Sequence, residues 1–594
     1  MQARQSLADI QFLLTEVLHA PAQWQALAPF AETDADLAAQ VLEEAAKFVD
    51  TAIAPLQRVG DEVGCRFDAG KVHTPPGFRE AYQAFWQGGW PALACAPEDG
   101  GQGLPAVLEC VLYEWLDGAN HGFTMAPGLL HGAYECLKHH ASDELKARYL
   151  EKVATGEWLA TMCLTEAHAG SDLGQVRTRG VPQPDGSARV NGSKIFISGG
   201  EHDLTDNIVH LVLARLPDAP AGPKGLSLFL VPKMLESGDG RRAGPPQARP
   251  APSGGSEPHE VGSVGVPNAV VCERIEEKMG LHGSPTCVMR FDDATGWLVG
   301  EPNKGLAAMF VMMNAARLHV GLQGIGLLEA AWQKASAYAA ERRQMRAPGV
   351  SGTSGTSLIQ DHPAIRRTLH TQRAWIDGGR VLAYHTGVQL DVAQHSTDAA
   401  ERADAQRWCA LVTPVLKAAF TDQGFHGASA CLQVFGGHGY VSEWGIEQIV
   451  RDARVAMIYE GTNEIQAIDL LVRKVLTDGG AGMQALLTTL PATPRRNALA
   501  QTTRDLVAAV AEHADQPELP YWVADDYLRA TALVLLEWAW GRITGTPGSA
   551  TARWQDPAHA LRTWVLPEFD MRLAIVRQRL SDAATPQEKL LSSA

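Results

Sequence analysis

The sequence predicts a mainly α-helical protein with a β domain at its centre. Three observations support this prediction: apolar residues at helical spacing before residue 160, short β-type runs from there to 300, and long helical segments afterwards. At roughly 150 residues per domain, a chain of 594 residues should hold three to four domains. We therefore expect units at 1–160, 161–300, 301–475 and 476–594.

The N-terminal unit and the β unit differ in pattern. DADLAAQVLEEAAKFVDTAIAPL and AVLECVLYEWLDGAN are typical of helices, with a Gly/Pro connector at 96–105. NIVHLVLARL and GLSLFLVP follow one another without intervening helices, which predicts an antiparallel sheet or small barrel. The stretch 237–263 is rich in Pro, Gly and Ser, so we expect a long mobile loop inserted in this sheet.

The remaining chain is predicted to be helical. AAMFVMMNAARLHVGLQGIGLLEAAWQKASAYAAERRQM predicts one helix of over thirty residues, and a Gly/Ser-rich break at 346–357 separates it from further helices up to 475. A last helical block, 476–594, opens with the loop DGGAG and the Pro-rich LPATPRR. The nucleotide and hydrolase motifs GxGxxG, GxxxxGK[ST], GxSxG and HExxH are absent, so any chemistry must come from other segments.

Composition narrows the functional class. A net charge of -16 argues against a nucleic-acid binder and against attachment to an anionic membrane surface. Nine scattered cysteines without a CxxC pair indicate reduced thiols in a cytoplasmic protein, without a disulfide framework or zinc site. The 20 histidines do not cluster, so we expect no metal. Asp9 and Glu16 interrupt the first apolar stretch, and no apolar run nears about 18 residues, so we expect neither signal peptide nor membrane span.

Two segments of the β unit are candidate ligand sites. In MCLTEAHAGSDLGQVRTR (162–179), the turn at 169–172 exposes backbone N–H groups that suit an anionic or carbonyl-rich ligand. A surface turn with Asx-type bonding at Asp172 is an equal alternative. In NGSKIFISGG (191–200), Asn-Gly predicts a tight hairpin turn, and Phe196 and Ser198 should share a strand face that can flank a flat ring. Considered alone, this segment is better explained as a core strand.

Two further segments lie in the second helical unit. QVFGGHGY (433–440) offers Gly436 and Gly437 for close backbone approach to a ligand, although, considered alone, it is better explained as a helix C-cap followed by a turn. In RDARVAMIYEGTNEIQAIDL (451–470), a helix should begin near Thr462 or Asn463, directly after Glu460. That carboxylate is either a helix-dipole partner, the reading slightly favoured locally, or a general base whose pKa rises on burial.

Together these segments closely resemble the acyl-CoA dehydrogenase family over about residues 40–475. LTEAHAGSD, KIFISGG, AAERRQ, QVFGGHGY and IYEGTNEIQ occur in the expected order and spacing, and five motifs in register are specific. The longer N-terminus and added C-terminal helices resemble the large bacterial subgroup of 3-methylmercaptopropionyl-CoA and broad-range fatty acyl-CoA dehydrogenases. The resemblance implies an N-terminal helical domain, a middle β-barrel-like domain and a C-terminal four-helix bundle, to which this chain adds an extra C-terminal helical domain.

The resemblance also implies roles for single residues. Glu460 aligns with the catalytic base, and the position at which some relatives carry that base is Ala316 here, which cannot act. Residues implied to bind FAD are Met162, Leu164, Thr165, Ser171, Phe196, Ser198, Arg342, Gln433, Gly436, Gly437, Thr462 and Glu464. Residues implied to contact acyl-CoA are Ser171, Asn314, Arg317 and Gly461. Phe196, Ser198 and Glu464 depart from the usual Trp, Thr and Gln of the family.

The implied reaction is FAD-dependent α,β-dehydrogenation of an acyl-CoA thioester to the trans-2-enoyl-CoA. Glu460 would take the α-proton, a hydride would pass to flavin N5, and electrons would leave to an electron-transfer flavoprotein. The resemblance implies a homodimer or a dimer of dimers, in which Arg342, Gln433 and the paired glycines bind the FAD of the other subunit. The alternatives are an acyl-CoA oxidase and a FAD-binding relative in DNA-damage response. A methylthio, a short and a long acyl group all stay open.

Overall fold

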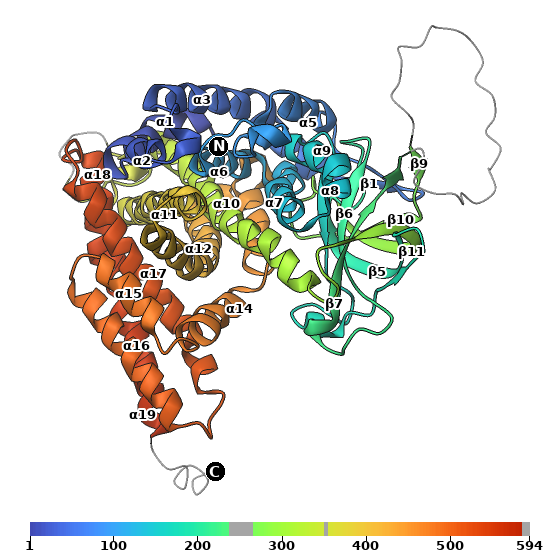
Figure 1. The fold of residues 1–594 in the computed structure, drawn as a ribbon. Helices are drawn as coiled ribbons and strands as arrows, with labels where there is room; N and C mark the ends of the chain where they lie inside the picture. Colours follow the sequence, from blue (N-terminus) through green and yellow to red (C-terminus); the bar gives the residue numbers. More distant parts are fainter. Residues whose placement is uncertain (237–264, 350–354, 585–594) are drawn as a thin grey trace, which may run out of the picture.

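The computed structural model describes residues 1–236, 265–349 and 355–584. A sheet domain lies on one side of a body of long helices, and a further helical block extends from that body away from the sheet (Figure 1). The expected loop at 237–263 lies outside the described residues, as does part of the break at 346–357.

The N-terminal part is helical except for one hairpin. Ala69 and Gly70, both with positive φ, turn the chain between two antiparallel three-residue strands, β1 (Arg66–Asp68) and β2 (Lys71–His73). Strands this short lack a readable alternation, so the sequence analysis did not predict them. The helices are α1 (Ala3–Phe12), α2 (Ala20–Gln25), α3 (Ala35–Phe48), α4 (Gln57–Val63), α5 (Phe78–Gln87), α6 (Ala106–Thr124), α7 (Leu130–His140), α8 (Asp143–Leu145) and α9 (Glu151–Thr155).

The sheet domain closes on itself. Pairing runs β11–β5–β4–β6, and β7 pairs with both β6 and β11, which completes a ring of strands, although β4 and β6 meet at one residue pair only. This agrees with the barrel-like domain expected above. Most pairs are antiparallel, but β3 pairs parallel to β6. The strands are β3 (Leu159–Cys163), β4 (Arg179–Pro182), β5 (Ala188–Ser198), β6 (Ile208–Arg215), β7 (Leu226–Pro232), β8 (Met234–Leu235), β9 (Val266–Pro267), β10 (Val270–Ile275) and β11 (Thr286–Val299).

The predicted hairpin turn at Asn191–Gly192 is wrong, because β5 runs straight through it. The Asn191 side chain instead donates to Asp293 on β11. Gly192 is needed for close approach, since a Cβ there would collide with Thr178. The turn between β4 and β5 lies earlier, where Ser187 donates to the Asp185 carboxylate. In this protein the Asn-Gly pair therefore marks a close approach between the backbone of β5 and Thr178, and not a turn.

The central body consists of long helices packed against α6. The predicted long helix is α10 (Gly305–Glu341), and α11 (Pro363–His395) and α12 (Ala399–Val434) pack on it. Two shorter helices, α13 (Ile446–Arg454) and α14 (Asn463–Ile468), cover α12. By length and composition α10 is apolar enough to cross a membrane, but 67% of its most apolar window is buried inside the protein. That burial is what a core helix shows.

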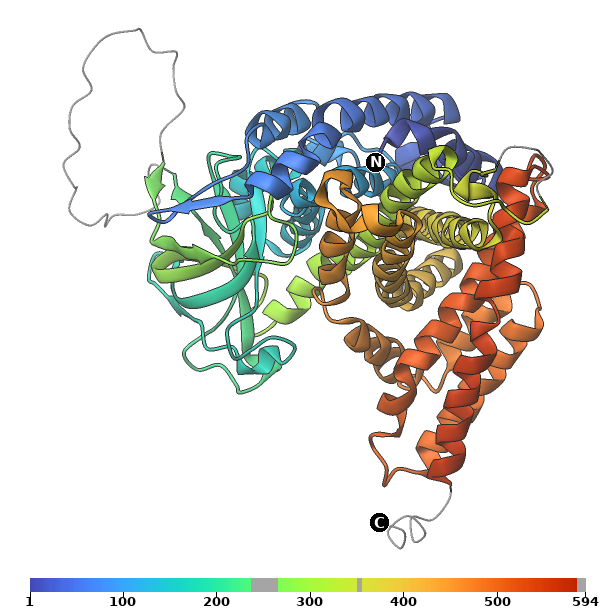
Figure 2. The same cartoon turned by 180° about the vertical axis from the view of Figure 1, so that it is seen from behind.

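The C-terminal block packs on the bundle. Trp540 Nε1 donates to the Ala374 carbonyl of α11 at 2.8 Å, and the Arg529 guanidinium lies 4.5 Å from the ring centre of Trp375. Figure 2 shows these helices against the bundle, on the side away from the sheet. The block is therefore continuous with the main core. Its helices are α15 (Ala481–Thr489), α16 (Pro494–Glu512), α17 (Leu519–Gly545), α18 (Ala552–Ala560) and α19 (Glu568–Ala583).

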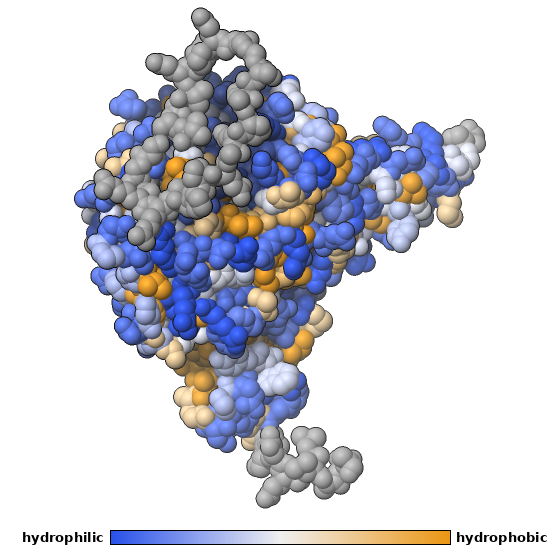
Figure 3. Space-filling view, turned by 90° about the vertical axis from the view of Figure 1, so that its right-hand side faces the viewer, coloured by the Kyte–Doolittle hydropathy of each residue, from blue (hydrophilic) through white to orange (hydrophobic). Residues whose placement is uncertain are grey.

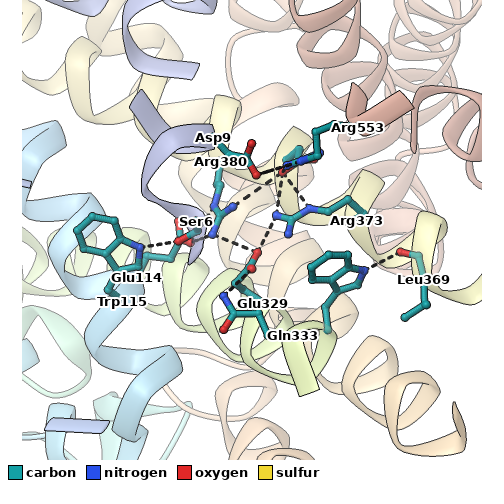
Figure 4. A network of polar contacts seen from close by, with 12 residues as sticks. Ser6, Asp9, Glu114, Trp115, Glu329, Gln333, Leu369, Arg373, Arg380 and Arg553 are labelled. Carbon is teal, nitrogen blue, oxygen red and sulfur yellow. Dashed lines mark hydrogen bonds and ion pairs between the residues drawn. The ribbon is translucent and has the colours of Figure 1, made fainter. Parts of the chain in front are cut away.

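A buried network of charges joins the helices of the bundle. Arg380 on α11 is fully buried and donates to Glu114 of α6 at 2.6 and 2.8 Å. It also lies 3.1 Å from Glu329 of α10, which Arg373 approaches to 2.6 Å (Figure 4). Burial opposes the ionised form of Glu329, but Arg373 and Arg380 outweigh it and lower its pKa to about 2. The network is therefore charged at neutral pH.

The same network reaches the two ends of the chain. Asp377 of α11 accepts from Arg373 and from Arg553 of α18, and Arg553 also donates to Asp9 of α1. The Asp377 pKa is lowered to about 2, since the arginines outweigh the effect of burial. Buried ion pairs of this kind depend on every partner, because removal of one leaves an uncompensated charge.

We expect Arg380→Met to lower the free energy of unfolding by about 3–5 kcal/mol, since Glu114 then lies buried without its cation. Denaturant unfolding of the FAD-loaded protein measures it. Arg58→Met is the control, because Arg58 pairs with Glu62 on the surface with 64% of its side chain exposed, and such pairs contribute less than about 1 kcal/mol. Equal losses in both variants would contradict a special role for the buried network.

Candidate active site

Glu460 lies in a strained bend directly before α14. Glu460 (φ 56) and Gly461 (φ 79) both have left-handed backbone, which costs a non-glycine residue about 1–2 kcal/mol. Buried Gln466 donates from Nε2 to the Glu460 carbonyl at 2.9 Å. Thr462 caps α14 by accepting from the Ile465 N–H. The first turns of α14 thus hold the bend in place.

The pKa of the Glu460 carboxyl group lies close to neutral pH. Its side chain is partly buried, and this burial raises its pKa to about 7, although Arg317 and Lys417 act in the opposite direction. Arg317 is a buried residue of α10 whose guanidinium lies 3.5 Å from Asp469 and 3.4 Å from exposed Asn314. A carboxylate with a pKa in this range is suited to general-base catalysis.

Tyr459, which precedes Glu460, contacts the C-terminal end of α6. Its hydroxyl donates to Gln323 at 2.5 Å and lies 3.5 Å from Met125 Sδ. Residue 126, adjacent to Met125, lies beside the turn after β5, where a Cβ on Gly199 would lie 3.0 Å from the Ala126 side chain. The end of α6 therefore lies between Tyr459 and the turn that follows Phe196 and Ser198.

The two candidate segments of the β domain, 162–179 and 191–200, contact each other. Thr165 accepts through its carbonyl from Ile195 N–H at 2.9 Å, and buried Lys194 donates to the Leu164 carbonyl at 2.9 Å. Phe196 has a positive φ where the β5–β11 register shifts, and 60% of it is exposed. The contact between β3 and β5 thus brings together five of the predicted residues: Met162, Leu164, Thr165, Phe196 and Ser198.

Ser171, Thr462 and Glu464 lie on two separate segments, the turn after β3 and the start of α14. Asp172 accepts from Gly174 N–H at 3.0 Å and caps a short turn, so the Asx-type alternative holds for Asp172. Ser171 beside it is exposed. Glu464 is exposed in the first turn of α14, after the cap residue Thr462.

Four predicted residues lie elsewhere on the chain. Arg342 ends α10, roughly 37 Å beyond Arg317 at 1.5 Å rise per residue. It belongs with the end of α12, since Tyr338 stacks on Phe435 at 4.3 Å, next to exposed Gln433, Gly436 and Gly437. Figure 3 shows that part of the chain projects as an arm from the rounded body of the molecule. One chain therefore holds two separate groups of predicted residues.

The sequence analysis did not single out several residues that build the site. Lys417 of α12, Asn463 and Gln466 contact the bend or its helix. The sequence does contain a feature that indicates Lys417, because it is the only charged residue in the apolar stretch WCALVTPVLKAAFT. All nine cysteines are free thiols, and in the described part of the chain no three His, Cys, Asp or Glu residues gather as metal ligands.

Three family models match in chain order. They are the acyl-CoA dehydrogenase N-terminal domain at 36–157, the middle domain at 161–254 and the C-terminal domain at 303–475. The chain belongs to the acyl-CoA dehydrogenase family. It is therefore an oxidoreductase that acts on acyl-CoA thioesters with FAD as its cofactor.

Individual relatives support this membership. The chain is 44% identical to 3-methylmercaptopropionyl-CoA dehydrogenase of Ruegeria pomeroyi over 80% of this chain and 76% of that one. It is 34% identical to the broad-specificity linear acyl-CoA dehydrogenase FadE5 of Mycobacterium tuberculosis over 76% and 72%. The fold matches that of Bacillus anthracis acyl-CoA dehydrogenase complexed with FAD, with a TM-score of 0.68 and 19% identity over 93% and 89%.

The residues present fit FAD. A Cβ on Gly170, Gly436 or Gly437 would meet no atom within 4 Å, so the backbone at both groups is open to a ligand. Phe196 is an aromatic residue left mostly exposed beside Thr165, as a flat partner would require.

We expect Gln466→Leu to lower kcat at least tenfold while FAD stays bound, because the strained bend loses its bond to the Glu460 carbonyl. Steady-state kinetics together with flavin absorbance measure both properties. Gln484→Leu in the C-terminal block is the control, since its amide donates to the Ala500 carbonyl far along the chain. An unchanged kcat in Gln466→Leu would show that the bend at Glu460 does not need the hydrogen bond from Gln466.

Proposed function

We propose that this protein dehydrogenates acyl-CoA between the α and β carbons, giving the trans-2-enoyl-CoA, with Glu460 as the base. The observation that carries the proposal is the Glu460 carboxylate itself, held in a strained bend, partly buried, and with a pKa of about 7. When bound, FAD supplies the acceptor for the β-hydride at flavin N5.

The chain's own groups have distinct tasks in this proposal. Glu460 removes the α-proton, and burial lets it hold that proton near neutral pH. The Glu460 N–H has no hydrogen-bond acceptor among the described residues, so it is free to donate to the thioester oxygen as negative charge develops. Arg317, Asn314, Gly461 and Ser171 would contact the CoA thioester.

The flavin would lie against the wall of β3 and β5. Met162, Leu164, Thr165, Phe196 and Ser198 would contact its ring, and Ser171, Thr462 and Glu464 would lie toward its phosphates. Arg342, Gln433, Gly436 and Gly437 would bind the FAD of a second copy, because one chain separates them from Glu460 by tens of ångströms. We therefore include a homodimer, or a dimer of dimers, in the proposal.

The electron acceptor in this proposal is an electron-transfer flavoprotein, as the family resemblance implies, and oxygen is the alternative. Turnover with each acceptor, measured in parallel, separates a dehydrogenase from an oxidase. A cytoplasmic location is also proposed, since nine free thiols suit a reducing compartment. Methylthio, short and long acyl groups are the candidate substrates, and a kinetic screen across acyl-CoA thioesters distinguishes them.

We expect Glu460→Gln to keep FAD but to lose at least a thousandfold in the rate of flavin reduction by acyl-CoA, because the amide cannot accept the α-proton. Anaerobic stopped-flow bleaching of the flavin measures it. Rapid bleaching in the variant would assign the base to another residue.

We expect kcat/KM to fall as the pH drops through about 7, since the base must be a carboxylate and its pKa is about 7. Below the pKa each pH unit should cost about tenfold, and above it the profile should level off. A pH profile of kcat/KM at fixed ionic strength checks this. A midpoint near 4.5, the ordinary value for a glutamate, would contradict a raised pKa for the base.

A further inference from the structure

A lysine lies buried next to the base. Lys417 projects from the middle of α12 and has no exposed surface. Its stretch of helix is otherwise apolar, with Leu416, Ala418 and Phe420 buried around it. A lone ammonium in such surroundings is costly to bury, so its presence calls for a compensating role.

The partner of Lys417 is neutral. Its Nζ donates to the side-chain oxygen of Asn463 at 2.9 Å, and within the described residues no carboxylate lies in ion-pair range of it. Asn463 does not need a cation for its own placement. Thr421 donates to the same oxygen at 3.1 Å, and the Asn463 amide donates to the Ala418 carbonyl at 3.1 Å. An uncharged side chain at 417 would therefore suffice to hold the start of α14.

The charges around Lys417 come from three directions. Glu460 in the bend and Glu464 on α14 favour its ammonium form, while Arg317 on α10 opposes it. Burial is the largest effect and lowers the Lys417 pKa to about 7. Arg317 is itself balanced by Asp469, which also pairs with Lys474 at 3.1 Å. Neither Glu460 nor Glu464 has an ion pair of its own among the described residues, but Glu464 is exposed. Glu460 is thus the partly buried carboxylate on which the charge of Lys417 acts.

We propose that Lys417 is a positioning residue for the base: from α12, its buried ammonium acts with Arg317 from α10 to favour the carboxylate form of Glu460, so that the base is ionised when acyl-CoA binds. This inference rests on the proposed function of Glu460. It differs from a purely structural role in one respect, because it depends on the charge at 417 and not on the hydrogen bond to Asn463.

The test compares pH profiles of kcat/KM for four FAD-loaded proteins: wild type, K417Q, K417R and T421V. K417Q keeps a donor but loses the charge, and K417R keeps the charge. T421V removes a neutral donor to the same Asn463 oxygen and is the matched control. FAD content, from flavin absorbance, and the melting temperature are recorded for each protein.

We expect K417Q to move the acid limb up by about one pH unit, which is about a tenfold loss of kcat/KM at pH 6. K417R and T421V should keep the limb within about 0.3 units of wild type. An unmoved limb in K417Q, or an equal shift in T421V, overturns the proposal. If K417Q does not retain FAD, K417M is measured in its place, and loss of FAD in both neutral variants shows a structural lysine and overturns it too. Wild type without dehydrogenation of any acyl-CoA would instead refute the proposed function.

Discussion

The charge network around Arg380 is the constraint on which the helical body depends. Arg380 and Arg373 join Glu114 of α6 to Glu329 of α10, and Arg553 extends the network to α18 and to Asp9 of α1. These partners come from five helices spread over the whole chain. Because desolvated charges must all be matched, the network favours one mutual arrangement of these five helices. α12 carries no member of the network and packs on α10 and α11.

The site uses α10, which carries Glu329 of this network, and its packing neighbour α12. α10 contributes Arg317 and α12 contributes Lys417, and both cations act on the carboxylate in the bend that follows α13. Burial alone would leave Glu460 mostly protonated at neutral pH, whereas two close cations alone would leave it a weak base. The balance between these effects places its pKa near 7, which suits a residue that must first take and then hold a proton.

The β domain forms the other side of the proposed cofactor site. Its strands close into a ring, and the turn after β5 lies against the end of α6. In the proposed function, Arg342 at the end of α10 would bind the flavin of a second copy. The separation of the predicted cofactor-binding residues into two groups on one chain is the reason that the proposal includes two copies.

The sequence by itself determined the family and the helix–sheet–helix order, because these depend on motifs along the chain. It also predicted Glu460 as the base, since the alternative position for that residue carries Ala316. The sequence also predicted α10, because its helical pattern continues over more residues than a strand or a loop would span. The sequence-based prediction was wrong at Asn191–Gly192 and missed the β1–β2 hairpin. In both places the local sequence does not specify the structure, which depends on pairing with neighbouring strands. Only the tertiary structure decided the left-handed bend at Glu460, the bond from Gln466 and the burial of Lys417. Each of these arises from contacts between residues distant in sequence or from local backbone that packing enforces, and charge and burial act through space, not along the chain.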